Sequence, residues 1–182
     1  MNKLSIFIVL VSMILIASCD SNSKSNGLDK DVVNKEIADL RLEIERSGIN
    51  SVSEKAPFKI VKLYVEYAEA FPKDTLSKGY LFECAQVNLG LGLVPEAIAN
   101  LDTIVERYPN DDLAPSALNF KAFILDDRMR RWQKAAEVLD VLMEKYPDSE
   151  AAKNAPAYKA TLGRSLDDVI KDMELKNKAA KE

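Results

Sequence analysis

Residues 96–109 read Glu-Ala-Ile-Ala-Asn-Leu-Asp-Thr-Ile-Val-Glu-Arg-Tyr-Pro, and they align without a gap on residues 134–147, Lys-Ala-Ala-Glu-Val-Leu-Asp-Val-Leu-Met-Glu-Lys-Tyr-Pro. Six of the fourteen positions are identical: Ala97/Ala135, Leu101/Leu139, Asp102/Asp140, Glu106/Glu144, Tyr108/Tyr146 and Pro109/Pro147. The apolar residues recur at the spacing of one helix face, and each segment ends in a proline, which a helix does not continue through. The two segments therefore predict two copies of one helix.

The repetition extends to the residues around these helices. Three aromatic–proline pairs recur at nearly equal intervals: Phe71-Pro72, Tyr108-Pro109 and Tyr146-Pro147. Upstream, residues 80–89 correspond to residues 117–126, which pairs Leu81 with Leu118 and Ala85 with Ala122. From Asp29 onward no segment alternates convincingly with the period of a strand. The sequence thus predicts an all-α fold in which the repeated unit is a helical hairpin.

Small residues and helix breakers hold fixed places in this unit. They are Ala85, Leu91-Gly92, Ala97 and Pro109 in one copy, and Ala122, Ala135 and Pro147, with one extra residue in the loop, in the next. This spacing resembles the tetratricopeptide repeat, over roughly residues 57–175. The resemblance implies an α-solenoid that binds other proteins and is not an enzyme. The residues expected to pack the repeats are Leu81, Ala85, Gly92, Ala97, Leu101, Tyr108, Pro109, Leu118, Ala122, Ala135, Leu139, Tyr146 and Pro147.

One predicted helix precedes the repeat domain, which we place at residues 54–178. This N-terminal helix occupies residues 29–48, and its apolar residues Val33, Ile37, Leu40 and Ile44 form one stripe. The stripe has two interpretations: it packs as the partner or cap of the first repeat, or it forms a short coiled coil between chains.

A second flanking helix is predicted at the end of the repeats. Ser165 offers an N-cap with Asp168 three residues on, and an apolar stripe follows. We interpret it as a capping helix whose polar face ends the solenoid.

The N-terminus has the pattern of a targeting segment. Lys3 precedes an apolar run from Leu4 to Ile16, which is too short to span a bilayer as a helix. The residues Ile16-Ala17-Ser18-Cys19 resemble the lipobox of bacterial lipoproteins, which implies a signal peptide over residues 1–18 and a covalent lipid such as palmitate on Cys19. Residues 19–28 are small and polar and are expected to form a flexible tether.

This anchor also sets the expected location. We expect attachment to the outer membrane on the periplasmic side. Asp20 follows the lipidated cysteine directly, and this residue type retains some lipoproteins at the inner membrane, which is the alternative.

Composition argues against most catalytic chemistry. The chain of 182 residues has no histidine, so it lacks the usual general base and the commonest zinc ligand. With 25 basic and 29 acidic side chains, its net charge of −4 does not suggest a nucleic-acid partner. We expect no catalytic residue, no metal and no cofactor besides the lipid on Cys19. Cys84 is interpreted as a buried, inert thiol.

A cluster of cations beside a tryptophan is the candidate partner surface: Arg128, Arg130, Arg131 and Trp132. Arginine and tryptophan are enriched where proteins bind one another. The alternative is that Trp132 packs between helices while the arginines are solvated.

The lipid anchor, the Tyr-Pro endings and the unit lengths look most like the BamD-type lipoproteins, which assist the assembly of outer-membrane β-barrels. We therefore expect a scaffold that binds proteins of the cell envelope. One alternative is a periplasmic adaptor of envelope constriction, of the Tol-Pal type, with a short N-terminal coiled coil. Another is a lipid-anchored enzyme that uses carboxylates.

Overall fold

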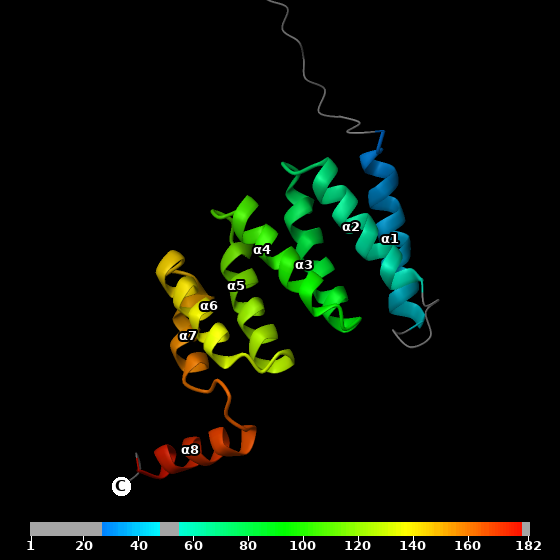
Figure 1. Cartoon of the computed structure of the whole chain (residues 1–182). Coiled ribbons are helices and arrows are strands. Elements are labelled where there is room, and N and C mark those ends of the chain that lie inside the picture. Colours follow the sequence, from blue (N-terminus) through cyan, green and yellow to red (C-terminus); the bar gives the residue numbers. More distant parts are fainter. Residues whose placement is uncertain (1–26, 48–54, 180–182) are drawn as a thin grey trace, which may run out of the picture.

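The computed structural model describes residues 27–47 and 55–179, and all the regular elements in these ranges are helical, as predicted (Figure 1). The elements are α1 (Lys30–Ser47), α2 (Ala56–Ala70), α3 (Thr75–Gly90), α4 (Val94–Arg107), α5 (Leu113–Phe123), the π-helical turn η1 (Ile124–Arg128), α6 (Trp132–Lys145), α7 (Glu150–Lys159) and α8 (Leu166–Ala179). From α1 to α7, each helix packs against the next, so the chain forms a tetratricopeptide-like α-solenoid. The predicted signal peptide, Cys19 and most of the tether lie outside the described residues.

The aromatic–proline pairs end the second helix of each hairpin in the same way. Phe71, Tyr108 and Tyr146 have nearly equal backbone angles, with φ of −126°, −127° and −132°. Their carbonyl groups accept hydrogen bonds from the amides of Asp74, Asp111 and Ser149 at 2.9, 3.0 and 3.0 Å. The proline lies inside this turn, where its missing N–H costs nothing. The turn then leads directly into the next helix.

Side chains at these turns satisfy the amides of the following helices. A carboxylate oxygen of Asp74 accepts from the amide of Leu76 at 2.8 Å, and Asp111 accepts from Leu113 at 3.0 Å. In the third turn this role falls to Ser149, whose hydroxyl accepts from the amide of Ala152 at 3.1 Å. Such caps stabilise a helix by about 1 kcal/mol each.

Most of the residues expected to pack the repeats are buried at helix crossings. They are Leu81, Ala85, Ala97, Leu101, Leu118, Ala122, Ala135 and Leu139. Tyr108 and Tyr146 are half-buried, but Gly92, Pro109 and Pro147 are exposed. These three residues therefore shape the turns and do not fill the core. Gly92 has a φ of 77°. Glycine adopts this left-handed conformation without steric cost.

Polar contacts at a constant sequence interval join each second helix to the following first helix. Lys121 pairs with Asp102 and Lys159 with Asp140, both at 2.5 Å. The sequence repetition of Asp102 and Asp140 thus reflects a repeated ion pair. Between α2 and α3, the Tyr64 hydroxyl donates to Glu83 at 2.7 Å across the same interval.

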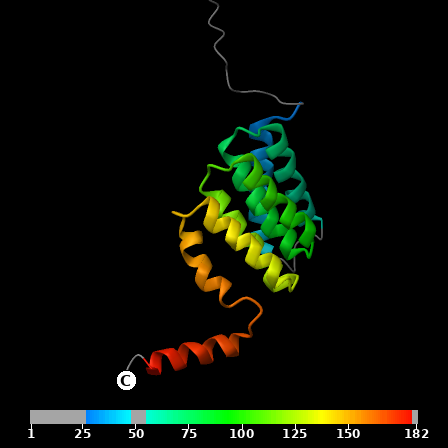
Figure 2. The same ribbon diagram turned by 60° about the vertical axis from the view of Figure 1, so that its left-hand side comes forward.

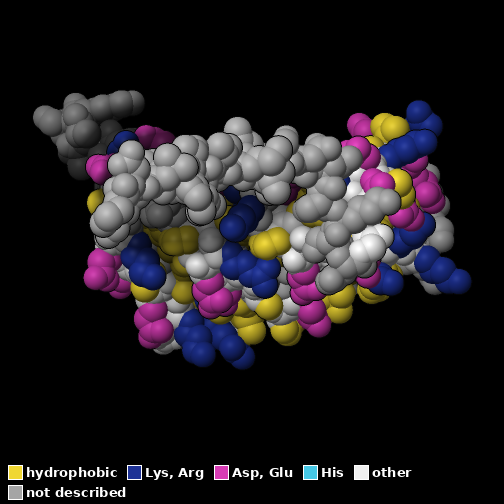
Figure 3. Space-filling model, turned by 90° about the horizontal axis from the view of Figure 1, so that it is seen from above, with side chains coloured by type: hydrophobic (Ala, Val, Ile, Leu, Met, Phe, Trp, Pro, Cys, Tyr) yellow, Lys and Arg dark blue, Asp and Glu magenta, His cyan; other side chains and the backbone are white. Residues whose placement is uncertain are grey.

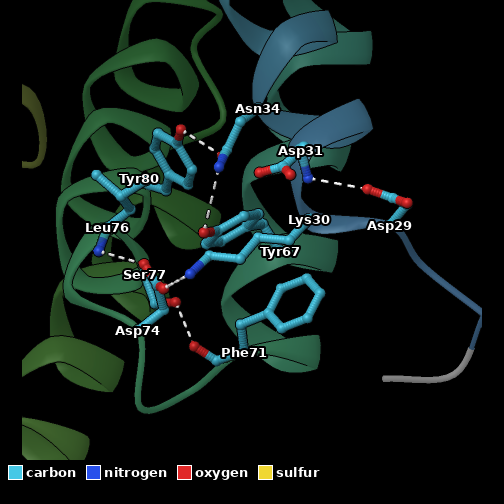
Figure 4. Close-up of polar contacts among 10 residues, drawn as sticks. All are labelled: Asp29, Lys30, Asp31, Asn34, Tyr67, Phe71, Asp74, Leu76, Ser77 and Tyr80. Atoms are coloured by element: carbon cyan, nitrogen blue, oxygen red, sulfur yellow. Dashed lines mark hydrogen bonds and ion pairs between the residues drawn. The ribbon is translucent and has the colours of Figure 1, made fainter. Parts of the chain in front are cut away.

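The N-terminal helix α1 packs as the first helix of the first hairpin. Val33, Ile37 and Leu40 are buried in a core shared with α2 and α3. Figure 4 shows the polar contacts at its N-terminal end: Lys30 pairs with Asp74, and Asn34 accepts from the Tyr80 hydroxyl at 2.9 Å. The apolar stripe is therefore used within the chain, as the first of its two interpretations predicted.

The C-terminal helix α8 differs from its prediction. Ser165 does cap it, because its hydroxyl accepts from the amide of Asp168 at 3.2 Å. However, α8 packs against none of the other described helices and projects away from α7 (Figure 2). Ile170 and Leu175 are exposed. The prediction of a capping helix is thus wrong: an amphipathic pattern indicates that a helix has an apolar face but not what that face contacts.

Candidate functional site

The first helices of the hairpins lie on the inner side of the array. Helix α3 approaches α5, and α5 approaches α7, with Cα atoms within 8 Å. The second helices do not come this close: α4 approaches neither α2 nor α6. Because the first helices converge and the second helices splay, the solvent-facing sides of α3, α5 and α7 form the inner face.

An aromatic row lies on this inner face. It consists of Phe82 on α3 with Phe120 and Phe123 on α5. The ring centroids of Phe82 and Phe120 are 5.7 Å apart, and those of Phe120 and Phe123 are 6.2 Å apart. Phe82 and Phe120 are partly buried, whereas Phe123 remains 41% exposed. The row offers rigid apolar surface of the kind that anchors protein–protein interfaces.

Sequence reasoning missed the aromatic row. In the alignment of residues 80–89 with 117–126, Phe82 corresponds to Asn119 and Phe120 to Glu83, so the row does not follow the repeat. Periodicity alone cannot separate these residues from core residues, because phenylalanine usually fills a core. Both sequence neighbours of Phe123, Ala122 and Ile124, are fully buried, so only the packing of the helices shows that Phe123 itself is exposed.

The predicted partner surface begins in a π-helical turn. Residues Asp126–Arg128 belong to η1, and the amide of Met129 donates to the carbonyl of Ile124, five residues back, at 3.2 Å. A π-helical turn accommodates one inserted residue in an α-helix. The third hairpin consists of α5, η1 and α6. Its extra residue is therefore accommodated in the π-helical turn at the end of α5.

Arg130 is the only non-glycine residue in the described ranges with a positive φ, at 52°. It lies five residues before Ala135, as Gly92 lies five before Ala97. The two hairpins thus use the same left-handed turn, but the third builds it with an arginine. For a residue with a Cβ atom, this conformation costs about 1–2 kcal/mol.

All four residues of the predicted partner surface are exposed. Trp132 is 40% exposed, and its ring lies so close to Gly163 that a Cβ atom there would be 2.6 Å from Trp132 Cδ2. Arg128 pairs with Asp127 at 3.1 Å. Arg130 and Arg131 are exposed, and neither forms an ion pair within the described part of the chain. Arg130 and Arg131 are therefore the two predicted cations whose charge no other described residue neutralises, and they could face a partner.

The surroundings of Cys84 disfavour reaction of its thiol. It is fully buried, and its sulfur accepts hydrogen bonds from the amides of Asn100 at 3.2 Å and Asn88 at 3.5 Å. Burial raises the pKa of the Cys84 thiol to about 11, so the thiol stays protonated at neutral pH and is a poor nucleophile.

Two carboxylates that each adjoin a second aspartate in the sequence make structural contacts. Asp111 accepts from the amide of Leu113 at the start of α5 and pairs with Lys78, while Asp126 accepts from the Tyr158 hydroxyl at 3.3 Å. Within residues 27–47 and 55–179 there is no group of three or more histidine, cysteine or carboxylate side chains placed to hold a metal ion. None of the helices in these ranges is long and apolar enough to cross a membrane.

Comparison with protein families supports the repeat and its role. Residues 121–149, from the second half of α5 to the cap of α7, match the family model of the tetratricopeptide repeat. Tetratricopeptide repeats mediate protein–protein interactions, which supports a scaffold with protein partners. A comparison with curated proteins finds no match for this chain.

Proposed function

We propose that this protein is a lipid-anchored scaffold of the bacterial cell envelope that holds a protein partner on the inner face of its helical array. The observation that carries the proposal is the aromatic row Phe82, Phe120 and Phe123, which exposes apolar surface on the inner side of a tetratricopeptide-like solenoid. Because clusters of aromatic side chains supply much of the affinity of protein interfaces, this row is the expected anchor.

The proposed membrane anchor is a lipid on Cys19. The lipobox-like sequence Ile16-Ala17-Ser18-Cys19 supports it. Several acyl chains at one site would hold the protein stably, since each buried CH₂ contributes about 0.8 kcal/mol. Cys19→Ala should abolish labelling with radioactive palmitate. Cys84→Ala is the matched control, because it removes the other cysteine and should leave the label in place. Labelling that survives Cys19→Ala would contradict the anchor.

We further propose that the partner is an outer-membrane β-barrel or a member of its assembly machinery, as for BamD-type lipoproteins. This assignment rests on the resemblance of the lipid anchor and the Tyr-Pro repeats. Chemical crosslinking in intact membranes, followed by mass spectrometry, should recover a β-barrel protein. Recovery of peptidoglycan-associated proteins alone would contradict it. Separation of inner and outer membranes by density tests the location, with the inner membrane as the outcome that Asp20 would favour.

The alternative of a coiled-coil adaptor is less favoured. A coiled coil would use the stripe Val33, Ile37 and Leu40, which is buried against α2 and α3. Pairing between chains through this stripe would first have to separate α1 from its own array. Sedimentation equilibrium distinguishes the two: a monomer agrees with the scaffold, whereas a trimer abolished by Ile37→Asp would favour the adaptor.

A further inference from the structure

A cavity of about 350 Å³ lies on the outer side of the array, between α4 and α6. Ile98, Leu125, Met129 and Val138 form its apolar walls, and Lys121, Arg131, Lys134 and Glu137 are its charged residues. This volume is at the small end of ligand sites and suits one or two side chains. It lies on the opposite side of α5 from the aromatic row, so the two surfaces are separate.

The free charges of this cavity are mainly positive. Lys121 is neutralised by Asp102 at 2.5 Å. Arg131 and Lys134 are exposed, and neither forms an ion pair within the described part of the chain, so with Glu137 they leave one net positive charge. Arg130, the preceding residue, is also exposed but does not line the cavity. The chain as a whole has a net charge of −4, whereas this cavity is positive. A positive cavity favours an acidic ligand.

The cations belong to the third hairpin and not to the repeat itself. Leu93 stands where Arg131 stands, because each is the N-cap residue of the second helix. Glu96 stands where Lys134 stands, one residue before Ala97 and Ala135 respectively. The second hairpin folds in the same way with an apolar and an acidic residue at these positions. Arg131 and Lys134 are therefore not required for the hairpin to form.

We propose that this outer cavity binds an acidic peptide segment of a partner protein. An apolar side chain of the segment lies against Ile98, Leu125 and Met129, and a neighbouring carboxylate faces Arg131 and Lys134. Methionine adapts its shape readily, which suits a wall that receives side chains from another protein. The inference rests on the proposed role as a protein scaffold but not on the aromatic row.

The position of the cavity favours a protein over a lipid headgroup. The chain enters α1 at the edge of the array that carries the turns after α2, α4 and α6, whereas the turn between α5 and α6, which contains Arg131, lies at the opposite edge (Figure 1). The proposed lipid on Cys19 is thus joined to the array at the first edge and not at the edge that carries Arg131. On the part of the first edge that is not covered by grey residues, Figure 3 shows basic and acidic side chains interspersed, so this part is not a uniformly basic surface.

Fluorescence anisotropy with the full chain in detergent tests the proposal. The probe is a fluorescein-labelled peptide of repeated Gly-Glu-Leu-Glu-Phe-Glu, compared with one in which Gln replaces Glu and one in which Ser replaces Leu and Phe. The acidic, apolar probe should bind at least about tenfold more tightly than either comparison peptide. The double variant Arg131→Glu/Lys134→Glu should weaken its binding at least about tenfold.

The matched control is Lys73→Glu/Lys145→Glu, which changes the net charge equally at two exposed lysines that form no ion pair in the described residues. This control variant should bind the acidic probe with an affinity within about twofold of that of the unmodified protein, since distant surface charges are largely screened by salt. Equal losses in both double variants, or no detectable binding of the acidic probe, would overturn the proposal.

A vesicle assay separates the peptide from a lipid surface. If Arg131→Glu/Lys134→Glu reduces only the flotation of Cys19→Ala protein with phosphatidylglycerol vesicles, and not peptide binding, the proposal is overturned in favour of a lipid surface. Failure of the aromatic row to bind a partner would leave the peptide results unaffected, so the two proposals fail separately.

Discussion

Arg130 and Gly92 occupy the same left-handed position in consecutive hairpin turns, and only one of them is suited to it. Glycine adopts a positive φ freely, whereas a side chain with a Cβ atom is strained there. The sequence did not reveal this strain, because the turn is recognised by its glycine and the third hairpin has none. The strained arginine adjoins Arg131, at the outer cavity.

The first prediction is that Arg130→Gly stabilises the protein by about 1 kcal/mol. Gly92→Ala should destabilise it by a similar amount, because a Cβ atom at Gly92 meets nothing within 4 Å and its cost is conformational only. Urea denaturation measures both free energies of unfolding. A loss of stability in Arg130→Gly would show that the Arg130 side chain makes a contact that outweighs the strain.

A second prediction concerns pH. Burial raises the pKa of Cys84 from 9.0 to about 11, so between these values the folded state keeps a proton that the unfolded state releases. The free energy of unfolding should therefore be unaffected below about pH 8.5 and fall as the pH rises from 9 to 11. In Cys84→Ala this fall should be smaller. Denaturation at about pH 8 and about pH 10.5 checks it, and equal falls in both proteins would contradict the assignment.

At the scale of elements, the hairpins followed from a few residues. The aromatic–proline pairs predicted where α4 and α6 end, and the alanines predicted where neighbouring helices cross, because each has a local steric cause. The π-helical turn η1 could not be predicted. The sequence shows that the third hairpin has one extra residue, but either a helix or a loop can accommodate such an insertion. The position of α8 could not be predicted either, because the residue pattern of one helix does not show which other helices it contacts.

The third prediction tests the placement of α1. Ile37 is fully buried against α2 and α3. Ile37→Ala should therefore lower the free energy of unfolding by about 3 kcal/mol. Leu42 lies on the same helix but is 46% exposed, so Leu42→Ala should cost only a few tenths of a kcal/mol. Chemical denaturation of both variants measures the difference. Similar small costs would mean that α1 is not part of the core.

The fourth prediction tests the correction made for α8. Because α8 packs against no other described helix, deletion of residues 166–182 should leave the free energy of unfolding unchanged to within a few tenths of a kcal/mol. A capping helix would shield the apolar residues of α7, and its loss would be costly. A decrease of about 2 kcal/mol, which is the cost of uncovering one buried apolar side chain, would restore the capping interpretation.

At the scale of the whole molecule, the repeat accounts for both what was predictable and what was not. An α-solenoid buries its core between neighbouring hairpins, so the residues at the crossings repeat and can be recognised in one sequence. The outward-facing residues are free to differ between hairpins, as Lys134 and Glu96 do. The partner surfaces are made of such residues, and for this reason neither the aromatic row nor the outer cavity was predictable from the pattern.

The central claim is that the inner face holds a protein partner, and site-specific photocrosslinking tests it most directly. A benzophenone amino acid is introduced in place of Phe123 in the aromatic row or in place of Val141 on α6. The two side chains are 41% and 37% exposed, so they are matched in exposure but differ in face. In intact membranes, position 123 should give a discrete crosslinked protein that is reduced by Phe82→Ser, whereas position 141 should not give that product. Equal crosslinking from both positions, or none from position 123, would contradict the account.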